Sequence, residues 1–326
     1  MASANRVSAP SHEWISLRLI LQTVGIYALL VAAAIRLAHS PLFWPRLLLI
    51  PIWFAIGVWL DRMYTVAHEG VHRKLFPDQR FLNDAISTLL LIPICAPFSL
   101  FRRIHFFHHS ANRRDPATAA LDTFVLSRRP TGMGRLYYRA AWIFCVFLGG
   151  FFVHTLISFV LFLAVPTRLS QRISPVFRGF GWADRLRAWG ELAAALAFHL
   201  FLFRSLGMSD FLVGFVLPLI PFAWVFSLLL YIYHYRVSFG SDVRHNVRSL
   251  PQQRVFSWLL LNFNQHATHH HDPSLPWYQL TRQPHELPEP LAGNNDVSSL
   301  WQAIAQLRRG PVLFVRDAGE LKRVDS

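Results

Sequence analysis

The sequence predicts an all-α integral membrane protein with about four transmembrane helices in two hairpins. Additional helices are expected to be interfacial or re-entrant, and a histidine-rich cap is expected on the cytosolic side. Three observations predict this fold. Hydrophobic residues make up 53% of the 326 residues and charged residues only 15%, against about 25% in soluble domains. Several apolar stretches approach the roughly 20 residues that a membrane helix needs. Eight histidines form three tight clusters beside these stretches.

Residues 14–38 and 41–60 are expected to form the first helical hairpin. Both segments are long and apolar, and only two residues separate them. Asp61 and Arg62 are then expected to mark the return of the chain to water. The first histidine cluster follows within two helical turns, which predicts a position close to the membrane surface.

Two further apolar segments are expected to enter and leave the membrane on one side, or to lie along its surface. Residues 81–101 contain two prolines and lie between the first two histidine clusters, which a single crossing would separate. Residues 140–165 contain a Gly-Gly pair and lead into the Arg-rich loop 168–187, which the positive-inside rule places in the cytosol. A full crossing by residues 140–165 is the alternative.

Residues 189–203 and 211–233 predict a second hairpin, joined by the more polar residues 204–210, and this hairpin delivers His234 to the cytosolic face. The chain that follows is more polar and richer in proline. We therefore expect a membrane domain at 1–285 and a soluble cytosolic tail at 286–326, with both termini in the cytosol. A multi-pass protein of this kind is expected in a bacterial inner membrane.

The formal charge of +14 fits a membrane protein with Arg-rich cytosolic loops. Binding to nucleic acid is the rival interpretation, and we reject it because the arginines lie between apolar segments and form no single stripe. The two cysteines, Cys95 and Cys145, both lie in apolar stretches. They predict neither a disulfide framework nor a cysteine metal site.

The spacing inside the histidine clusters predicts a metal centre. Residues three and four apart lie on one face of a helix, and neutral imidazole is a common ligand of transition metals. One zinc ion takes three or four ligands, so this many histidines indicate two metal ions. The clusters are His68-x-x-x-His72, His105-x-x-His108-His109 and His266-x-x-His269-His270.

A ninth ligand is expected between the second and third clusters. His234 is preferred over His245 because the end of a membrane helix fixes its position. His271 lies five residues after His266, off the shared face, and is excluded, while His285 is expected to be a residue of the tail. Four nearby carboxylates could orient metal-bound histidines or pair with arginines instead: Glu69, Asp115, Asp242 and Asp272.

His68-Glu69-x-x-His72 alone also matches the zinc-protease signature. A protease would leave the other two clusters without a role, so this reading is set aside.

At these residues the chain resembles the membrane fatty acid desaturase and hydroxylase superfamily, over residues 40–285. The order of the three clusters and the lone histidine matches, as do the Asn-rich approach to His266 and the Pro-Trp turn at Pro276. The resemblance implies two iron ions, molecular oxygen and nine iron ligands: His68, His72, His105, His108, His109, His234, His266, His269 and His270.

The activity expected from this resemblance is oxygen-dependent oxidation of unactivated C–H bonds in a long acyl chain, bound as a lipid or a fatty acid. Desaturation is the first interpretation. Hydroxylation, carotenoid ketolation and oxidative decarboxylation to a terminal alkene are the alternatives within the same class, because the Pro-Trp turn is shared with ketolases and His271-Asp272 stands where many desaturases have Leu-Phe. A non-catalytic metal-binding or transport protein is the alternative from another class.

The sequence contains no haem motif, no ferredoxin cysteine set and no dinucleotide fingerprint. Electrons are therefore expected from a separate donor such as ferredoxin, rubredoxin or cytochrome b5 with its reductase. Such carriers are typically acidic, and the basic loops would attract them.

Overall fold

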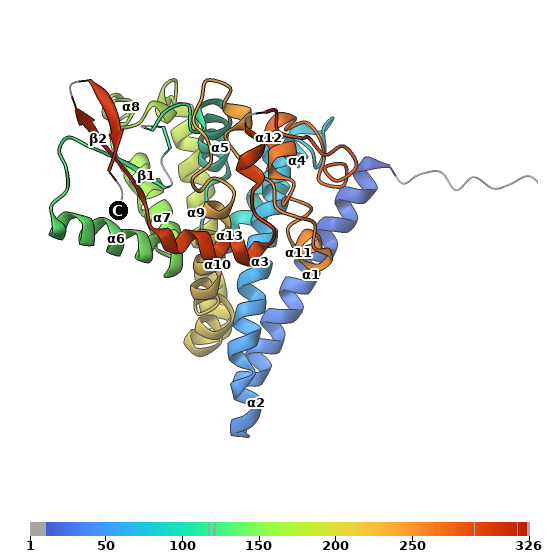
Figure 1. The fold of residues 1–326 in the computed structure, drawn as a ribbon. Coiled ribbons are helices and arrows are strands. Elements are labelled where there is room, and N and C mark those ends of the chain that lie inside the picture. Colours follow the sequence, from blue (N-terminus) through green and yellow to red (C-terminus); the bar gives the residue numbers. More distant parts are fainter. Residues whose placement is uncertain (1–10, 117, 120–121, 290, 318, 325–326) are drawn as a thin grey trace, which may run out of the picture.

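The structure is a computed structural model that describes residues 11–116, 118–119, 122–289, 291–317 and 319–324. Helices dominate it, and long helical segments extend from a broad end where most of the shorter elements gather (Figure 1). Within these described ranges, three helices are long and apolar enough to cross a membrane, or up to five if each of two bent helix pairs counts as one span.

The first hairpin consists of α1 (His12–Ala38) and of α2 (Phe43–Leu47) followed by α3 (Leu49–Val71). α1 packs on α3, where Trp59 Nε1 donates a hydrogen bond to the Thr23 carbonyl oxygen over 2.7 Å. The outer faces of both helices leave large apolar side chains exposed, as expected of surfaces that face lipid.

The prediction that Asp61 and Arg62 mark the return to water is wrong. α3 continues through both residues, and both are buried. The Arg62 guanidinium lies over the rings of Trp59 and Trp258 and donates to the carbonyl oxygens of Trp258 and Leu259, the latter over 3.0 Å. The C-terminal part of the chain folds over this turn of α3 and supplies the partners that water would otherwise supply.

The second hairpin reverses direction inside an apparently continuous helical run. α9 (Trp182–Phe211), the π-helical η3 (Leu212–Val216) and α10 (Leu219–Ile232) follow one another. Residues eight apart in a straight helix are separated by about 12 Å along the axis, yet the ring centroids of Phe203 and Phe211 are 5.8 Å apart. The reversal falls at Gly207, whose φ of 79° lies outside the helical region, and thus within the predicted connection.

Residues 81–101 fold into a bent pair. α4 (Arg80–Leu91) with η1 (Ile92–Ile94) meets α5 (Phe98–Ala111) at 99°. Cys95, with φ 52°, and Pro97, two residues later, break the helix. The segment is therefore not one straight helix, and its expected re-entrant or in-plane course stays a prediction.

α6 (Gly132–Phe147) and α7 (Gly150–Ala164) form a second bent pair, at 91°. The break falls at Gly149, whose φ is 76° and whose Cβ, if it had one, would lie 2.9 Å from Ala223 Cβ on α10. The Arg-rich segment 168–187, predicted as a loop, is largely helical, and its Arg187, on the first turns of α9, pairs with Asp84 of α4 over 3.0 Å. A bend of this kind belongs to a broken span as well as to a re-entrant pair, so both the expected return to one side and the identity of that side stay predictions.

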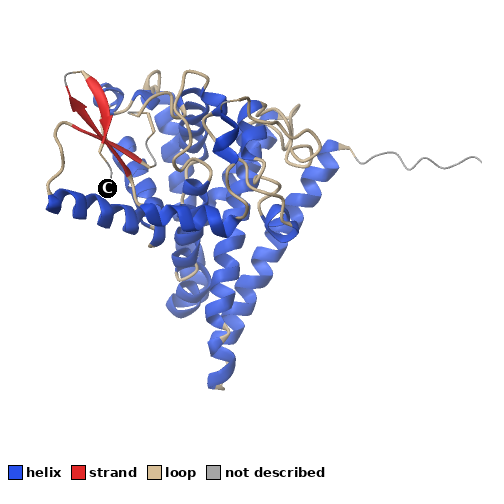
Figure 2. Ribbon diagram, viewed as in Figure 1, coloured by secondary structure: helices blue, strands red, loops and turns tan. Residues whose placement is uncertain are grey.

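The all-α prediction missed a small sheet (Figure 2). β1 (Thr123–Leu126) pairs in parallel with β2 (Val312–Asp317), which pairs antiparallel with β3 (Glu320–Arg323). The partners β1 and β2 are far apart in the sequence, and strands of four to six residues give too little periodicity to be recognised locally.

The C-terminal segment packs on the rest of the chain. Trp142 Nε1 donates to the Leu307 carbonyl oxygen over 2.8 Å, and the Tyr235 hydroxyl donates to that of Gly310 over 2.7 Å. The division into two domains at residue 285 stays a prediction. The remaining short helices are α8 (Thr167–Ile173), η2 (Pro175–Phe177), η4 (Val243–His245), α11 (Arg254–Leu259), α12 (His266–His271), η5 (Leu291–Asn295), α13 (Leu300–Gln306) and η6 (Leu307–Arg309).

Candidate metal centre

The structure brings all nine predicted histidines together, in two neighbouring groups. They come from α3, α5, α12 and the turn after α10. Within each group the candidate ligand atoms lie within 4.8 Å of one another. The five-histidine group is His68, His72, His105, His109 and His269. The four-histidine group is His108, His234, His266 and His270.

Neighbours in the sequence are divided between the two groups. His108 and His109 follow each other on α5, and successive residues of a helix point about 100° apart. α5 and α12 each send adjacent histidines into different groups, and the rings of His109 and His270 stack with centroids 4.3 Å apart. The two groups are therefore in direct contact, as two sites of one dinuclear centre would be.

The separations between ring nitrogens fit metal coordination. Two nitrogen ligands with bonds of about 2.1 Å at right angles lie about 3.0 Å apart. Nε2 of His105 lies 2.9 Å from that of His68 and 2.8 Å from that of His72. The corresponding distance is 3.1 Å between His109 and His269, and 3.0 Å between His234 and His266.

Several ring nitrogens are buried without a hydrogen-bond partner among the described residues. His270 lacks a partner at both Nδ1 and Nε2. An unmatched buried polar group is costly, so the group requires a partner that the chain itself does not provide. A metal ion at Nε2 satisfies this requirement. Nδ1 is also unmatched in His68, His234, His266 and His269.

Burial makes the histidines outside the candidate spans favour their neutral form. It is the main cause that lowers the pKa of His72 to about 3, with Lys74 and Arg102 adding to the shift. Burial, followed by neighbouring histidines, also lowers the pKa of His234, His266 and His270. Neutral imidazole is the form that binds a metal.

All four carboxylates considered as histidine partners bond to groups other than the nine predicted ligands. Glu69 accepts a hydrogen bond from Trp277 N over 2.9 Å and pairs with Lys74 over 3.1 Å. Asp272 accepts from Ser274 N over 3.0 Å. Glu69 thereby holds the proline-rich segment against the first histidine cluster. Asp242 pairs with Arg244, and it also reaches His245, outside the two groups. The fourth, Asp115, accepts from Thr118 N over 2.9 Å.

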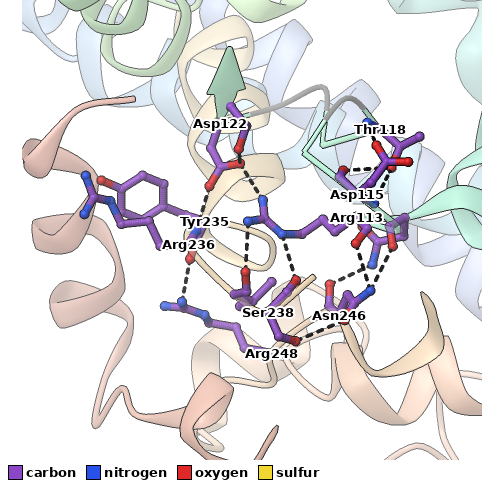
Figure 3. A network of polar contacts seen from close by, with 12 residues as sticks. Arg113, Asp115, Thr118, Asp122, Tyr235, Arg236, Ser238, Asn246 and Arg248 are labelled. Carbon is purple, nitrogen blue, oxygen red and sulfur yellow. Dashed lines mark hydrogen bonds and ion pairs between the residues drawn. The ribbon is translucent and has the colours of Figure 1, made fainter. Parts of the chain in front are cut away.

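A buried polar network holds the turn that carries His234 (Figure 3). Arg113, just after α5, pairs with Asp122 and donates to the carbonyl oxygen of Val237 over 2.9 Å. Asp122 also accepts from Arg236 N over 2.7 Å. The network links the end of the second histidine cluster to the chain immediately after His234, so it fixes the two relative to each other.

The structure places His234, and not His245, beside the other eight histidines. His245 instead lies with His271 and His285 in a third group. None of these three was chosen as a metal ligand from the sequence, and their spacing did not predict that they would come together. The only local signal was that His271 extends the third cluster.

Two adjoining cavities reach the histidines. The smaller, of about 70 Å³, is lined in part by histidines of both groups. The larger, of about 320 Å³, is mostly apolar and lies among α5, α7 and α10. Both are lined by His105, His108 and His234. The apolar walls of the larger cavity include Ile94, Ala96, Phe101, Ile104, Phe107, Phe151, Phe152, Phe159 and Leu230.

Comparison with known proteins defines the class. The family model described as fatty acid desaturase matches residues 42–296, and the chain belongs to this family of oxidoreductases. Two similar proteins are each named as an sn-1 oleoyl-lipid 12-desaturase. The one from Picosynechococcus sp. (strain ATCC 27264 / PCC 7002 / PR-6) is 31% identical over 90 residues, which are 28% of this chain and 22% of that protein. The one from Synechocystis sp. (strain ATCC 27184 / PCC 6803 / Kazusa) is 22% identical over 276 residues, 77% of this chain and 72% of that protein.

Proposed function

We propose that this protein is an oxygen-dependent di-iron enzyme that desaturates a long acyl chain. The observation that carries the proposal is the apolar cavity, whose lining includes His105, His108 and His234 and which shares these residues with the smaller cavity. A pocket of this size and composition suits an apolar ligand. Family membership and the names of the two relatives favour a lipid-linked acyl chain as the substrate.

The residues present fit two iron ions, one in the five-histidine group and one in the four-histidine group. When bound, the irons supply with oxygen the oxidising power that no side chain has toward an unactivated methylene. The walls of the apolar cavity hold the acyl chain extended and exclude water. His105, His108 and His234 line its end, so a methylene placed there lies next to both groups.

Desaturation, hydroxylation, ketolation and oxidative decarboxylation would all use this arrangement, and they differ in where the reacting carbons lie at the end of the cavity. The names of the relatives favour desaturation. The electrons are proposed to come from a separate acidic carrier that binds the basic cytosolic loops. The cap, with the histidines, is proposed to face the cytosol of a bacterial cell.

Metal analysis and product analysis together test the proposal. The purified chain is expected to hold about two irons, and cells that express it are expected to gain an unsaturated acyl chain. His269→Ala should abolish the product and lower the iron content. His39→Ala is the matched control, because this exposed histidine pairs with Asp210 at the far end of α1.

The nature of the product decides among the alternatives. An alcohol, an oxidised carotenoid or a terminal alkene one carbon shorter would replace desaturation by the corresponding reaction. One zinc per chain would contradict the di-iron site. Two irons without any product, when a suitable electron donor is supplied, would favour a metal-binding protein.

A further inference from the structure

A third histidine group lies outside the two buried ones. His245 comes from η4, His271 ends α12 and His285 follows the proline-rich segment. Their candidate ligand atoms lie within 4.8 Å of one another. His285 Nε2 is 3.2 Å from His245 Nε2, a separation close to the roughly 3.3 Å expected for two nitrogens bound to one tetrahedral ion with bonds of about 2.0–2.1 Å.

Asp242 orients His245 for coordination. Its Oδ2 lies 3.2 Å from His245 Nδ1. The other ring nitrogen of His245, Nε2, faces His285. A carboxylate that accepts a hydrogen bond from Nδ1–H leaves the Nε2 lone pair free for a metal, which is the usual arrangement of metal-bound histidine. Only 11% of the His245 side chain is exposed, so its orientation is well fixed.

The rings of His285 and His271 lie close enough to His245 to supply the second and third ligands. The main chain of His285 is fixed by a hydrogen bond from its N–H to Thr268 Oγ1 over 2.9 Å. Its ring is stacked on that of His271, with centroids 3.6 Å apart and planes at 4°. Stacked rings cannot both direct their lone pairs at one ion, because the lone pairs lie in the ring planes. His271 is exposed, so it can rotate out of the stack when an ion binds.

We propose that His245, His271 and His285 form a third metal site, at the surface of the cap, for one divalent ion of the zinc class such as Zn²⁺, Co²⁺ or Ni²⁺. Three imidazoles leave one position for water in a tetrahedral ion. The site is distinct from the two buried groups and does not depend on the proposed function.

An ion at this site would brace the cap. It would join the loop that follows His234, the end of α12 that carries His266 to His270, and the segment around His285. These segments position four of the nine histidines in the two groups, namely His234, His266, His269 and His270. Binding should therefore stabilise the arrangement of the buried groups without supplying a ligand to them.

The test is zinc uptake by the purified, tag-free, full-length chain with its iron in place. After equilibration with ZnCl₂ and gel filtration, the wild type is expected to retain about one zinc per chain with its iron content unchanged. The midpoint of thermal unfolding should rise by about 5 °C in the presence of excess zinc. His271→Ala and His285→Ala should each lose both effects, and His39→Ala should keep them.

Asp242→Asn gives a finer measure, because loss of the orienting carboxylate should weaken zinc binding by about 10- to 100-fold. Equal zinc uptake by the wild type and His271→Ala would overturn the proposal, since that exposed position tolerates alanine without loss of packing. Zinc uptake at the expense of iron, or none at all in the wild type, would overturn it as well and leave only a stack of imidazole rings.

Discussion

The buried pair of Arg113 and Asp122 offers a strong test of how His234 is held. In Asp122→Asn the Arg113 guanidinium remains buried without its counter-charge, since only 3% of the Arg113 side chain and none of the Asp122 side chain is exposed. Removing one partner of a buried pair costs about 3–5 kcal/mol. Arg113 keeps its bonds to two carbonyl oxygens and its place over the Phe239 ring, so we expect a loss of about 3 kcal/mol.

At about 2 °C per kcal/mol for a chain of this length, the midpoint of thermal unfolding in detergent should fall by roughly 6 °C. Iron content should fall with it, because the same network fixes the turn that carries His234. Asp317→Asn is the control, since this aspartate pairs with Lys322 with more than half of both side chains exposed. Exposed pairs contribute below about 1 kcal/mol.

The double variant Arg113→Met/Asp122→Asn separates the charge from the network. Without the buried cation, much of the lost stability should return, since replacement of both partners of a buried ion pair is often close to neutral. A shift below about 2 °C in Asp122→Asn, or a double variant less stable than both single ones, would refute the reasoning that an unpaired charge causes the loss.

Three further predictions concern packing, the cavity and pH. Gly57→Ala should destabilise the protein by about 1–3 kcal/mol and lower its iron content, because the new Cβ would lie 2.6 Å from the α10 backbone. Gly25→Ala is the control: it has open space around it and should unfold at the wild-type temperature. Ala96→Phe should fill part of the apolar cavity and reduce turnover of long acyl chains at unchanged iron content, whereas the exposed Leu89→Phe should not; equal turnover would exclude this cavity as the substrate site. The iron-free protein should lose stability as pH falls from about 6.5 toward 3. In the unfolded chain His72 takes up a proton near its ordinary pKa, whereas in the folded chain its pKa is lowered to about 3. A pH-independent midpoint of thermal unfolding over this range would contradict the prediction.

The sequence by itself predicted the helical class, the two helical hairpins and which nine histidines come together. These features are local. A membrane helix is recognised by its length and apolar composition, and histidines three or four residues apart share a helix face wherever that helix lies. The reversal at Gly207 and the bend at Gly149 also fall inside segments whose composition already predicted a break.

Only the tertiary structure decided how the histidines divide and what surrounds them. The spacing His105-x-x-His108-His109 does not say that His108 joins His234 while its neighbour joins His269, because the direction of each ring matters only once α3, α5, α10 and α12 are packed together. From the sequence, the charged Arg62 is expected in water. In the structure its guanidinium instead contacts the Trp258 ring and the Leu259 carbonyl oxygen, about 200 residues away in the sequence. The pairing of β1 with β2 and the third histidine group have the same origin: each joins residues that are distant in sequence, and contacts of that kind leave no periodic pattern along the chain.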